Sequence, residues 1–384
     1  MNKRFEALDA FRGICAIAVV VFHMHLVGSI TELQFFRGSS IFVDFFFVLS
    51  GFVLAHGYAY KKNLKFTSFM RSRFFRIYPL HIFMFLVIFT LELGKLIAYK
   101  FGGFIFNNIP FTNSFAINEI IPNLLLIQSW SSYTDPLSFN YPSWSISIEF
   151  YMYALFFCSI IAFNNYKVIA WAITSIIAFS LIYSQSSLIT SEVLRGVSCF
   201  FGGAFTYWLF LQTVTTFKLS VIVGTCLELL LLSMIIFAVQ SQFNHRSSIS
   251  SVLFMITVFF FAFEFGAISR LLRAKCFQLL GKLSYSIYMT HTAVLFCLTS
   301  IAIILHKVTG NAFTTMKDGI RFLDFGHTFT NNAVVIFIVM IVIAISNITY
   351  KYIELTGQRL NAKSNGSNDA CKNYPELKNQ KNDA

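Results

Sequence analysis

Charged side chains are scarce in this sequence. They make up 12% of the residues, whereas a soluble domain carries roughly one quarter. Hydrophobic residues make up 56%, 48 residues are Phe, and the mean hydropathy is +0.67. Apolar stretches approach the ~20 residues that cross a membrane as a helix, whereas a β-barrel would show shorter alternating strands. The scarcity of charge therefore excludes an ordinary soluble domain and favours a helical membrane protein.

Several signals of other protein classes are absent. The seven Cys show no paired metal-ligand spacing, and all but Cys276 and Cys371 fall within apolar stretches, as packing residues do. We predict no metal site. The net charge of +12 accompanies no nucleic-acid motif, so no nucleic acid is expected as a partner. No internal repeat and no linker divides the chain.

The apolar stretches predict an all-α fold, a polytopic membrane bundle of about ten transmembrane helices. The expected spans are 11–28, 40–58, 77–99, 146–163, 167–184, 194–211, 219–239, 251–269, 280–305 and 333–350. An even count places both termini on one side. Lys and Arg gather in the segments on that side, which the positive-inside rule assigns to the cytoplasm.

The expected membrane domain covers residues 1–356, and residues 357–384 form a polar tail that is expected to be disordered and cytoplasmic. Two long outer loops, about 100–145 and 306–332, are candidates for function. The first loop carries aromatic and polar residues suited to a sugar or another polar acceptor, or to an interfacial aromatic belt. These residues are Trp130, Tyr133, Asp135, Asn140, Tyr141 and Trp144.

The first apolar stretch, MNKRFEALDAFRGICAIAVVVFHMHL, lacks a small-residue cleavage site and is interrupted by Arg12, so we interpret it as a retained helix. Arg12 and His23 are eleven positions apart and share one helical face, about 16 Å apart along the axis. Arg12 could face a cavity or a partner, and His23 could act as a general base. Alternatively, Arg12 snorkels and His23 only bonds a neighbouring helix. His25 lies about 200° round the helix from His23, so we do not expect it to share that role.

A carboxylate lies within the next apolar stretch, SSIFVDFFFVLSGFVLAHGY. Asp44 there needs a cation or several donors, and Arg12 or His23 on the adjacent helix is the expected partner. The pair could frame a substrate site or be purely structural.

The following segment, KKNLKFTSFMRSRFFRIYPLH, carries two arginines at helical spacing. Arg73 and Arg76 would share one face and form a forked donor surface suited to phosphates. They could instead serve only as a positive-inside anchor.

Two later motifs add polar residues. Glu149 in PSWSISIEFYMY could orient a His, bind acceptor hydroxyls, or interact with the helix macrodipole. Ser284, Tyr285, Tyr288 and His291 in LGKLSYSIYMTH recur at helical spacing and could line one cavity or pack between helices. The residues assigned to substrate binding are Asp44, Trp144, Ser145, Tyr285, Tyr288 and His291.

These motifs together resemble a known family. LDAFRGICAIAVVVFH, VDFFFVLSGF, RSRFFRIYP, PSWSISIEFYMY, LGKLSYSIYMTH and YKYIE occur in the order found in the bacterial acyltransferase-3 membrane proteins. The resemblance covers about residues 6–356. A single motif would be weak, whereas the ordered set is specific.

The resemblance implies a ten-helix enzyme of the bacterial inner membrane with both termini in the cytoplasm. Such proteins take an acyl group, commonly acetyl, from cytoplasmic acyl-CoA and transfer it to an extracytoplasmic hydroxyl. The acceptor is often a carbohydrate or lipid-linked glycan, such as lipopolysaccharide O-antigen or an exopolysaccharide. By the same resemblance His23 is the catalytic base, Arg12 is its partner in positioning the acyl-CoA, and Arg73 and Arg76 hold the phosphates of acyl-CoA. From its own motif, Glu149 is assigned with His23 and Arg12 as a catalytic carboxylate. Membrane lipid is the other expected partner.

The chain departs from many relatives, which continue into a soluble hydrolase-like domain. Transfer is therefore expected to finish within the bundle or with another protein. A secondary transporter or flippase is the alternative, because a polar pathway also needs buried ionisable residues, although matched repeats are not found. A third possible function is that of a non-enzymatic sensor or assembly partner. It would not explain why Arg73 and Arg76 occur together with Arg12 and His23 within the membrane. Dependence on acyl-CoA distinguishes these functions.

Overall fold

The computed structural model describes residues 4–104, 106, 108–310, 312–317 and 319–364. Most of them are helical, as the long apolar stretches predicted. The helices are α1 Glu6–Phe22, α2 Gln34–Gly38, α3 Phe42–Tyr58, α4 Phe66–Gly102, α5 Ile120–Leu124, α6 Ser143–Phe163, α7 Lys167–Tyr183, α8 Ser191–Thr213, α9 Val221–Gln240, α10 Arg246–Phe261, α11 Ala267–Leu271, α12 Lys275–Thr309, α13 Thr328–Thr349 and α14 Leu355–Ser364. Two short strands, β1 Thr314–Lys317 and β2 Ile320–Leu323, pair as an antiparallel hairpin.

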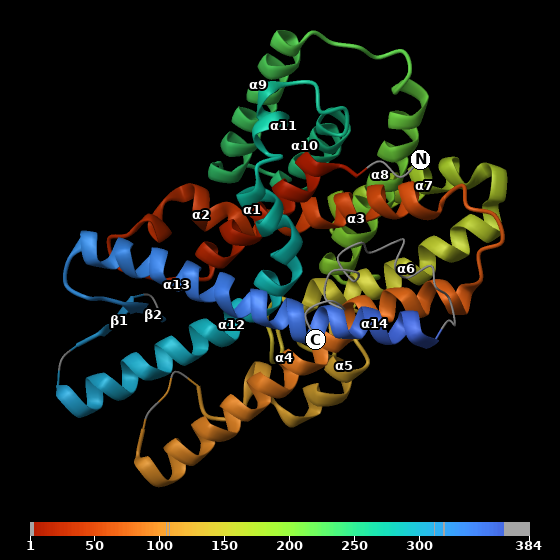
Figure 1. The fold of residues 1–384 in the computed structure, drawn as a ribbon. Helices are drawn as coiled ribbons and strands as arrows, with labels where there is room; N and C mark the ends of the chain where they lie inside the picture. The colour runs from red at the N-terminus through yellow and green to blue at the C-terminus, as the bar shows by residue number, and fades with distance from the viewer. Residues whose placement is uncertain (1–3, 105, 107, 311, 318, 365–384) are drawn as a thin grey trace.

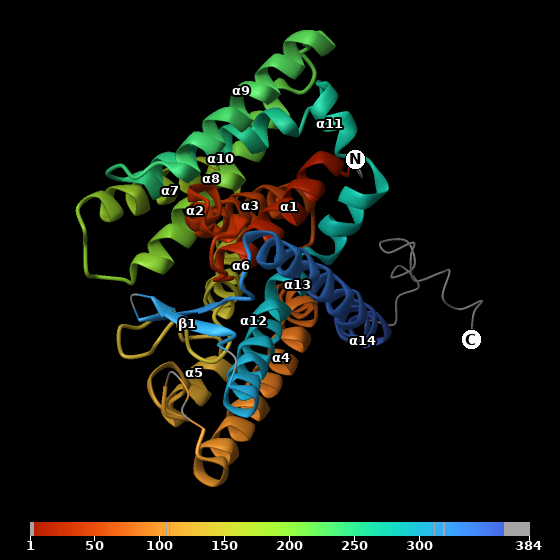
Figure 2. The same cartoon turned by 90° about the vertical axis from the view of Figure 1, so that its left-hand side faces the viewer.

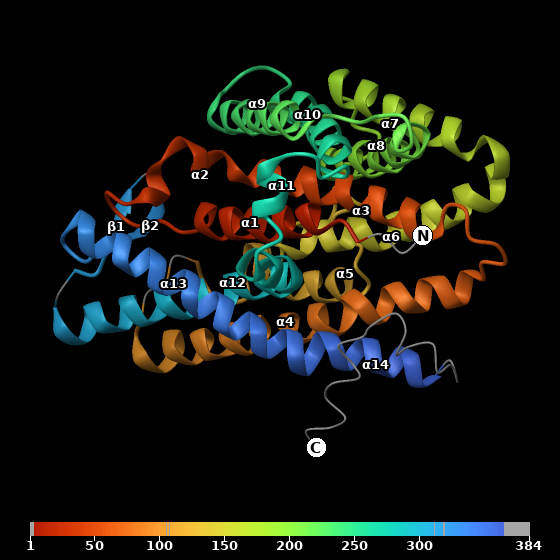
Figure 3. The same cartoon turned by 45° about the horizontal axis from the view of Figure 1, so that its top comes forward.

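The long helices pack in layers (Figure 1). In Figure 3, α7 to α10 lie at the top, α1, α3 and α6 form the middle layer, and α4, α12 and α13 lie below. Figure 2 shows α9 to α11 on the opposite side of the bundle from α4 and α12. α1 begins and α14 ends toward the same end of the bundle, and the hairpin lies at the other end (Figure 3).

Close helix contacts in the centre depend on small residues. A Cβ atom on Gly13 of α1 would overlap the backbone of Leu280 in α12, and one on Gly281 would overlap the Asp9 carbonyl. Small residues allow helix backbones to approach in this way inside membrane bundles. The two glycines therefore fix α1 against α12, the pair of helices on which the candidate site is built.

Seven helical segments of the described chain are long and apolar enough to cross a membrane. Each of the ten expected spans overlaps a helix. One segment, Ser143–Tyr183, contains both α6 and α7, while α1 and α10 have only 17 and 16 residues. The count of ten crossings therefore stays a prediction, whereas the helical, multi-pass character is confirmed.

Three local expectations need correction. Helix α4 begins at Phe66, ahead of the expected span 77–99, and continues through Pro79, so Arg73 and Arg76 lie within a helix that enters the bundle. The outer segment 306–332 contains the hairpin, because Gly319 at positive φ permits its tight turn. The tail begins as a helix, since α14 extends to Ser364, and residues 365–384 lie outside the described residues.

Candidate active site

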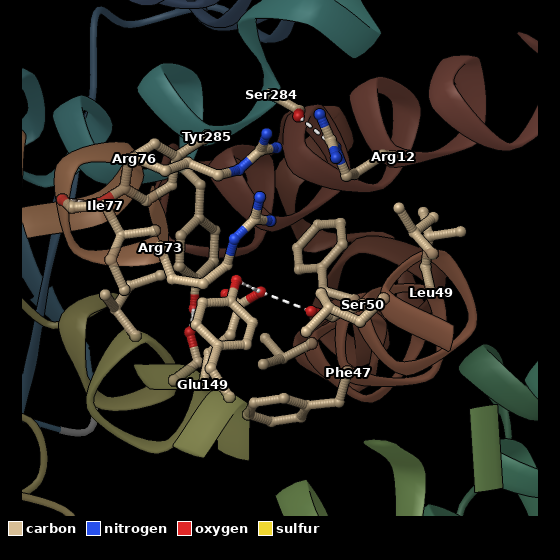
Figure 4. Close-up of a pocket in the computed structure, with 18 residues that line it drawn as sticks. Arg12, Phe47, Leu49, Ser50, Arg73, Arg76, Ile77, Glu149, Ser284 and Tyr285 are labelled. Carbon is tan, nitrogen blue, oxygen red and sulfur yellow. Dashed lines mark hydrogen bonds between the residues drawn. The ribbon is translucent and has the colours of Figure 1, made fainter. Parts of the chain in front are cut away.

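A cavity of about 130 Å³ lies among α1, α3, α4, α6 and α12. We call it the arginine cavity because Arg12, Arg73 and Arg76 line it. Figure 4 shows Arg73 and Arg76 extending from α4 toward Arg12 of α1. Its other polar lining residues are Ser50, Ser145, Glu149, Tyr153, Ser284, Tyr285 and Tyr288. The structure thus brings together three arginines that are far apart in the sequence.

Arg12 is held by the helix that packs on α1. Its Nε donates to Ser284 Oγ at 2.7 Å, and its Nη2 donates to the Gly281 carbonyl at 3.2 Å. The close approach of α1 and α12 at Gly13 and Gly281 makes this short reach possible. The guanidinium is therefore fixed at the cavity wall, which favours the cavity interpretation of Arg12 over snorkelling.

Arg73 has donor capacity left for a ligand. Its Nη2 donates to Tyr58 Oη at 3.0 Å, and its guanidinium lies 5.3 Å from the Tyr58 ring centre and 5.9 Å from that of Tyr153. Its buried Nε has no hydrogen-bond partner in the described part of the chain. Burying an unpaired donor is costly, so this atom fits a site that receives an anionic group. The residues present are consistent with a phosphate-bearing acyl-CoA.

Glu149 belongs to the same cavity and does not orient His23. It accepts hydrogen bonds from Ser50 Oγ at 2.7 Å and from Tyr153 Oη at 2.5 Å. Figure 4 shows it beneath the two α4 arginines. The idea that Glu149 supports His23 is therefore wrong, because the carboxylate is engaged on the arginine side.

A second carboxylate near the arginines was missed by the sequence analysis. Glu354 is buried, accepts from Ser286 Oγ at 3.2 Å, and lies within electrostatic range of Arg76 and Arg12. It ends a π-helical turn, Tyr350–Glu354, at the YKYIE motif. A lone acid at the end of an apolar stretch was the available signal.

A second cavity, of about 390 Å³, is lined in part by Gly319, Ile320 and Arg321 of the hairpin. We call it the histidine cavity because His23 and His25 line it. Its other polar lining residues are Lys95, Asn108, Tyr141, Thr292, Thr299, Ser300 and Arg321. Arg12 and His23 therefore face different cavities, although they share one helix.

The position of His23 follows from the end of α1. The helix ends at Phe22, and His23 caps it. The imidazole lies 5.1 Å from the His291 ring and 6.4 Å from the Tyr141 ring, between centroids. The ring of His23 has no hydrogen-bond partner in the part of the chain that the structure describes. This contradicts the alternative that His23 only bonds a neighbouring helix.

His25 lies in the same cavity as His23, contrary to expectation. The estimate of 200° assumed a continuing helix, but the helix has ended before His25. Its Nδ1 lies 3.0 Å from Arg37 Nη1. The backbone of His25 accepts from the Leu323 N–H at 2.9 Å, which attaches the hairpin to this segment.

The hairpin closes one side of the histidine cavity and is itself anchored to α13. Asp324 accepts hydrogen bonds from the Gly326 N–H and from Asn331 Nδ2, and these bonds lower the pKa of the Asp324 carboxyl. Arg321 donates to Thr314 Oγ1 across the two strands at 2.9 Å. The hairpin therefore forms part of the wall of this cavity, beside residues of α4 and α12.

The Ser/Tyr/His stripe of α12 does not line one cavity. Ser284, Tyr285 and Tyr288 face the arginine cavity, and Tyr288 Oη lies 2.9 Å from Ser145 Oγ. His291 lines neither cavity and is fully buried. The next residue, Thr292, faces the histidine cavity.

Asp44 pairs with neither Arg12 nor His23, so its expected partner was wrong. Its carboxylate receives Arg195 Nη2 at 2.8 Å and Ser247 Oγ at 2.8 Å, and it lines neither cavity. Trp144 lies beside this pair, with its ring centre 5.5 Å from the Arg195 guanidinium. These contacts favour the structural interpretation of Asp44.

The comparisons with known proteins agree with the motifs. A family described as "Acyltransferase domain", the acyltransferase-3 family, matches residues 5–351. "Acyltransferase MdmB" of Streptomyces mycarofaciens is 34% identical over 167 residues, which are 40% of this chain and 38% of that protein. "Protein 2 in picA locus" of Rhizobium radiobacter is 40% identical over 87 residues, 21% of this chain and 41% of that protein.

The matched segments span about two fifths of the length of each relative. No solved structure matches the chain. The family match, in contrast, extends over nearly all of the described residues. The chain is a multi-pass membrane protein that belongs to the acyltransferase-3 family.

Proposed function

We propose that this protein is a membrane O-acyltransferase that moves an acyl group from cytoplasmic acyl-CoA to a hydroxyl of an extracytoplasmic carbohydrate. The observation that carries the proposal is the position of two cavities along one helix. Arg12 of α1 lines the arginine cavity, and His23 at the end of α1 lines the histidine cavity. The arginine cavity, as the cationic donor site, and the histidine cavity, as the acceptor site with a general base, therefore lie at two points along α1.

The arginine cavity is the proposed donor site. Acyl-CoA supplies an activated acyl group and carries phosphates. Arg73 and Arg76 would hold these phosphates, and Arg73 Nε is a buried donor with no partner among the described residues. The space of about 130 Å³ favours a short acyl group such as acetyl.

The histidine cavity is the proposed acceptor site. An alcohol is a weak nucleophile until a base takes its proton, and we assign that role to His23, which lines this cavity. The aromatic residues Tyr141 and Phe139 line the cavity, which suits a sugar, and Thr299 and Ser300 offer hydroxyls. The volume of about 390 Å³ suits one or a few sugars of a glycan or lipid-linked glycan.

The proposed location is the bacterial inner membrane, with both termini in the cytoplasm. The excess of Lys and Arg in the segments assigned to the inner side supports this orientation. α1 begins and α14 ends at the end of the bundle away from the hairpin (Figure 3). The hairpin and the histidine cavity would then face the periplasm.

The test uses the purified protein in lipid with acetyl-CoA labelled in the acetyl group and with extracted bacterial surface glycans. Label that appears in the glycan together with one equivalent of free thiol supports the proposal. A control reaction without glycan offers only water as an acceptor. The thioester consumed there measures the background rate of hydrolysis. Glycan movement across the lipid without thioester consumption would establish a transporter or flippase instead.

A further inference from the structure

His291 lines neither cavity but lies between residues that line the two cavities. On one side, Tyr288 lies three residues earlier on α12 and lines the arginine cavity. On the other side, His23 lines the histidine cavity, and its ring centre is 5.1 Å from that of His291. His291 is 0% exposed, so the imidazole occupies the protein interior between the donor side and the acceptor side.

The imidazole of His291 has unused hydrogen-bonding capacity. Neither ring nitrogen makes a hydrogen bond of ordinary geometry within the described part of the chain, although the Ile287 and Tyr288 carbonyls lie near the ring. A neutral imidazole always carries one N–H donor. An unpaired buried donor is costly, and such groups are rare unless a ligand or water uses them.

The surroundings of His291 hold it in place. Asn140 Nδ2 donates to the Met289 carbonyl at 3.2 Å, and Thr292 Oγ1 donates to Asn140 Oδ1. On the far side of α12, Thr290 Oγ1 lies 3.0 Å from Ser346 Oγ of α13. The helix on both sides of His291 is therefore clamped, as a preorganised catalytic donor requires.

We propose that His291 is a catalytic residue whose N–H stabilises the negative charge on the carbonyl oxygen during acyl transfer. The inference rests on the proposed function. The hydroxyl proton of the acceptor passes to His23, and the acceptor oxygen forms a C–O bond to the carbonyl carbon. The carbonyl oxygen gains charge and accepts the His291 N–H bond. The C–S bond then breaks, and the thiolate takes the proton from His23 to give the free thiol.

This assignment gives the two histidines different chemical roles. His23 must exchange a proton, whereas His291 need only donate a hydrogen bond. An amide side chain can supply an N–H donor but cannot act as a base at neutral pH. Amide substitutions at the two positions should therefore have different effects.

The experiment compares His291→Leu, His291→Gln, His23→Gln and His23→Ala with the wild type in the labelled acetyl-transfer assay. Loss of an oxyanion donor costs about 100- to 1,000-fold in kcat, so His291→Leu should lose that much with an unchanged KM for acetyl-CoA. The kcat of His291→Gln should be at least about tenfold higher than that of His291→Leu, because Gln retains an N–H donor. His23→Gln should stay as inactive as His23→Ala.

A buried histidine elsewhere is the matched control. His81 in α4 is also buried, bonds the Asn123 carbonyl at 2.9 Å, and lines neither cavity. His81→Leu should lower thermal stability without lowering kcat of the folded protein. A thioether analogue of acetyl-CoA, which lacks the carbonyl oxygen, should bind the wild type and His291→Leu with equal Kd.

Each outcome decides between the roles. Wild-type kcat in His291→Leu, equal loss in His291→Leu and His291→Gln, or weakened binding of the thioether analogue would overturn the assignment of His291. In each of these cases the wild type still transfers acetyl, so the proposed function stands. Absence of acetyl transfer by the wild type would overturn both.

Discussion

The two cavities differ in how they are built. The walls of the arginine cavity come entirely from helices, namely α1, α3, α4, α6 and α12. The histidine cavity also uses the segment after α4, the segment before α6 and the hairpin, through residues such as Asn108, Tyr141 and Arg321. Rigid elements suit a donor whose chemistry is fixed, whereas loops allow an acceptor site to vary.

The cavities also differ in how their polar groups are satisfied. In the arginine cavity Arg12 bonds Ser284, and Glu149 bonds Ser50 and Tyr153. At the histidine cavity the ring of His23 has no hydrogen-bond partner among the described residues. The first cavity therefore holds Arg12 and Glu149 in place and leaves Arg73 Nε without a partner among the described residues, whereas the second leaves the proposed base, His23, without one. Substitutions on the two sides should therefore change different kinetic constants.

The largest effect is expected for His23→Ala. Removal of a general base costs about 100- to 10,000-fold in rate. Because His23 lies outside the arginine cavity, the Kd for acetyl-CoA should stay within about twofold of the wild type. Acetyl transfer and equilibrium binding, measured on the same preparation at equal folded yield, separate the two effects. Normal transfer in the variant would remove His23 from the mechanism.

Asp44→Asn tests a region that belongs to neither cavity. Removing one partner of a buried ion pair destabilises a fold by about 3 kcal/mol, and Asp44 is fully buried against Arg195. The midpoint of thermal unfolding in lipid should fall, while the Kd for acetyl-CoA of the folded protein stays unchanged. The unfolding midpoint of the Asp44→Asn/Arg195→Gln double variant should fall by less than the sum of the decreases in the two single variants. A specific loss of acceptor binding would instead restore the substrate-binding role of Asp44.

Arg73→Gln should weaken donor binding alone. A hydrogen bond to a charged group contributes about 1.5–3 kcal/mol, which corresponds to about a 10- to 150-fold rise in the KM for acetyl-CoA. Arg73→Lys should also be impaired, because an ammonium lacks the planar fork. Arg71→Gln on the same helix is the control, since Arg71 lines neither cavity. An equal change in the acceptor KM would contradict the separation of the two sites.

The sequence predicted the helices, and it predicted that Arg73 and Arg76 share a helical face, because both signals depend only on nearby residues. Apolar length predicts a helix, and the spacing of Arg73 and Arg76 places them on one face whether the helix begins early or late. For Arg12 the sequence left a cavity and snorkelling open, and the structure favours the cavity.

The polar partners were not predictable because they depend on packing between distant segments. Asp44 and Arg195 are 151 positions apart, and nothing in either motif identifies the other. The shared environment of His23 and His25 was missed for a local reason, namely that α1 ends at Phe22 without a Gly or Pro signal. The helical spacing predicted that His291 and Tyr288 could line one cavity. The observed position of His291 beside His23 depends instead on where α1 ends against α12.

The smallest effect is expected at the hairpin. Arg321 lines the histidine cavity and bonds Thr314 across the strands, so Arg321→Gln removes a partly solvated charge from the acceptor side. Such charges contribute about 0–1 kcal/mol, and the acceptor KM should therefore rise by no more than about fivefold with the donor KM unchanged. Lys317→Gln is the control, because Lys317 is on the same hairpin but does not line the cavity. A larger effect on the donor KM than on the acceptor KM would show that the hairpin acts on both sites, and the contrast between a helical donor site and a loop-built acceptor site would fail.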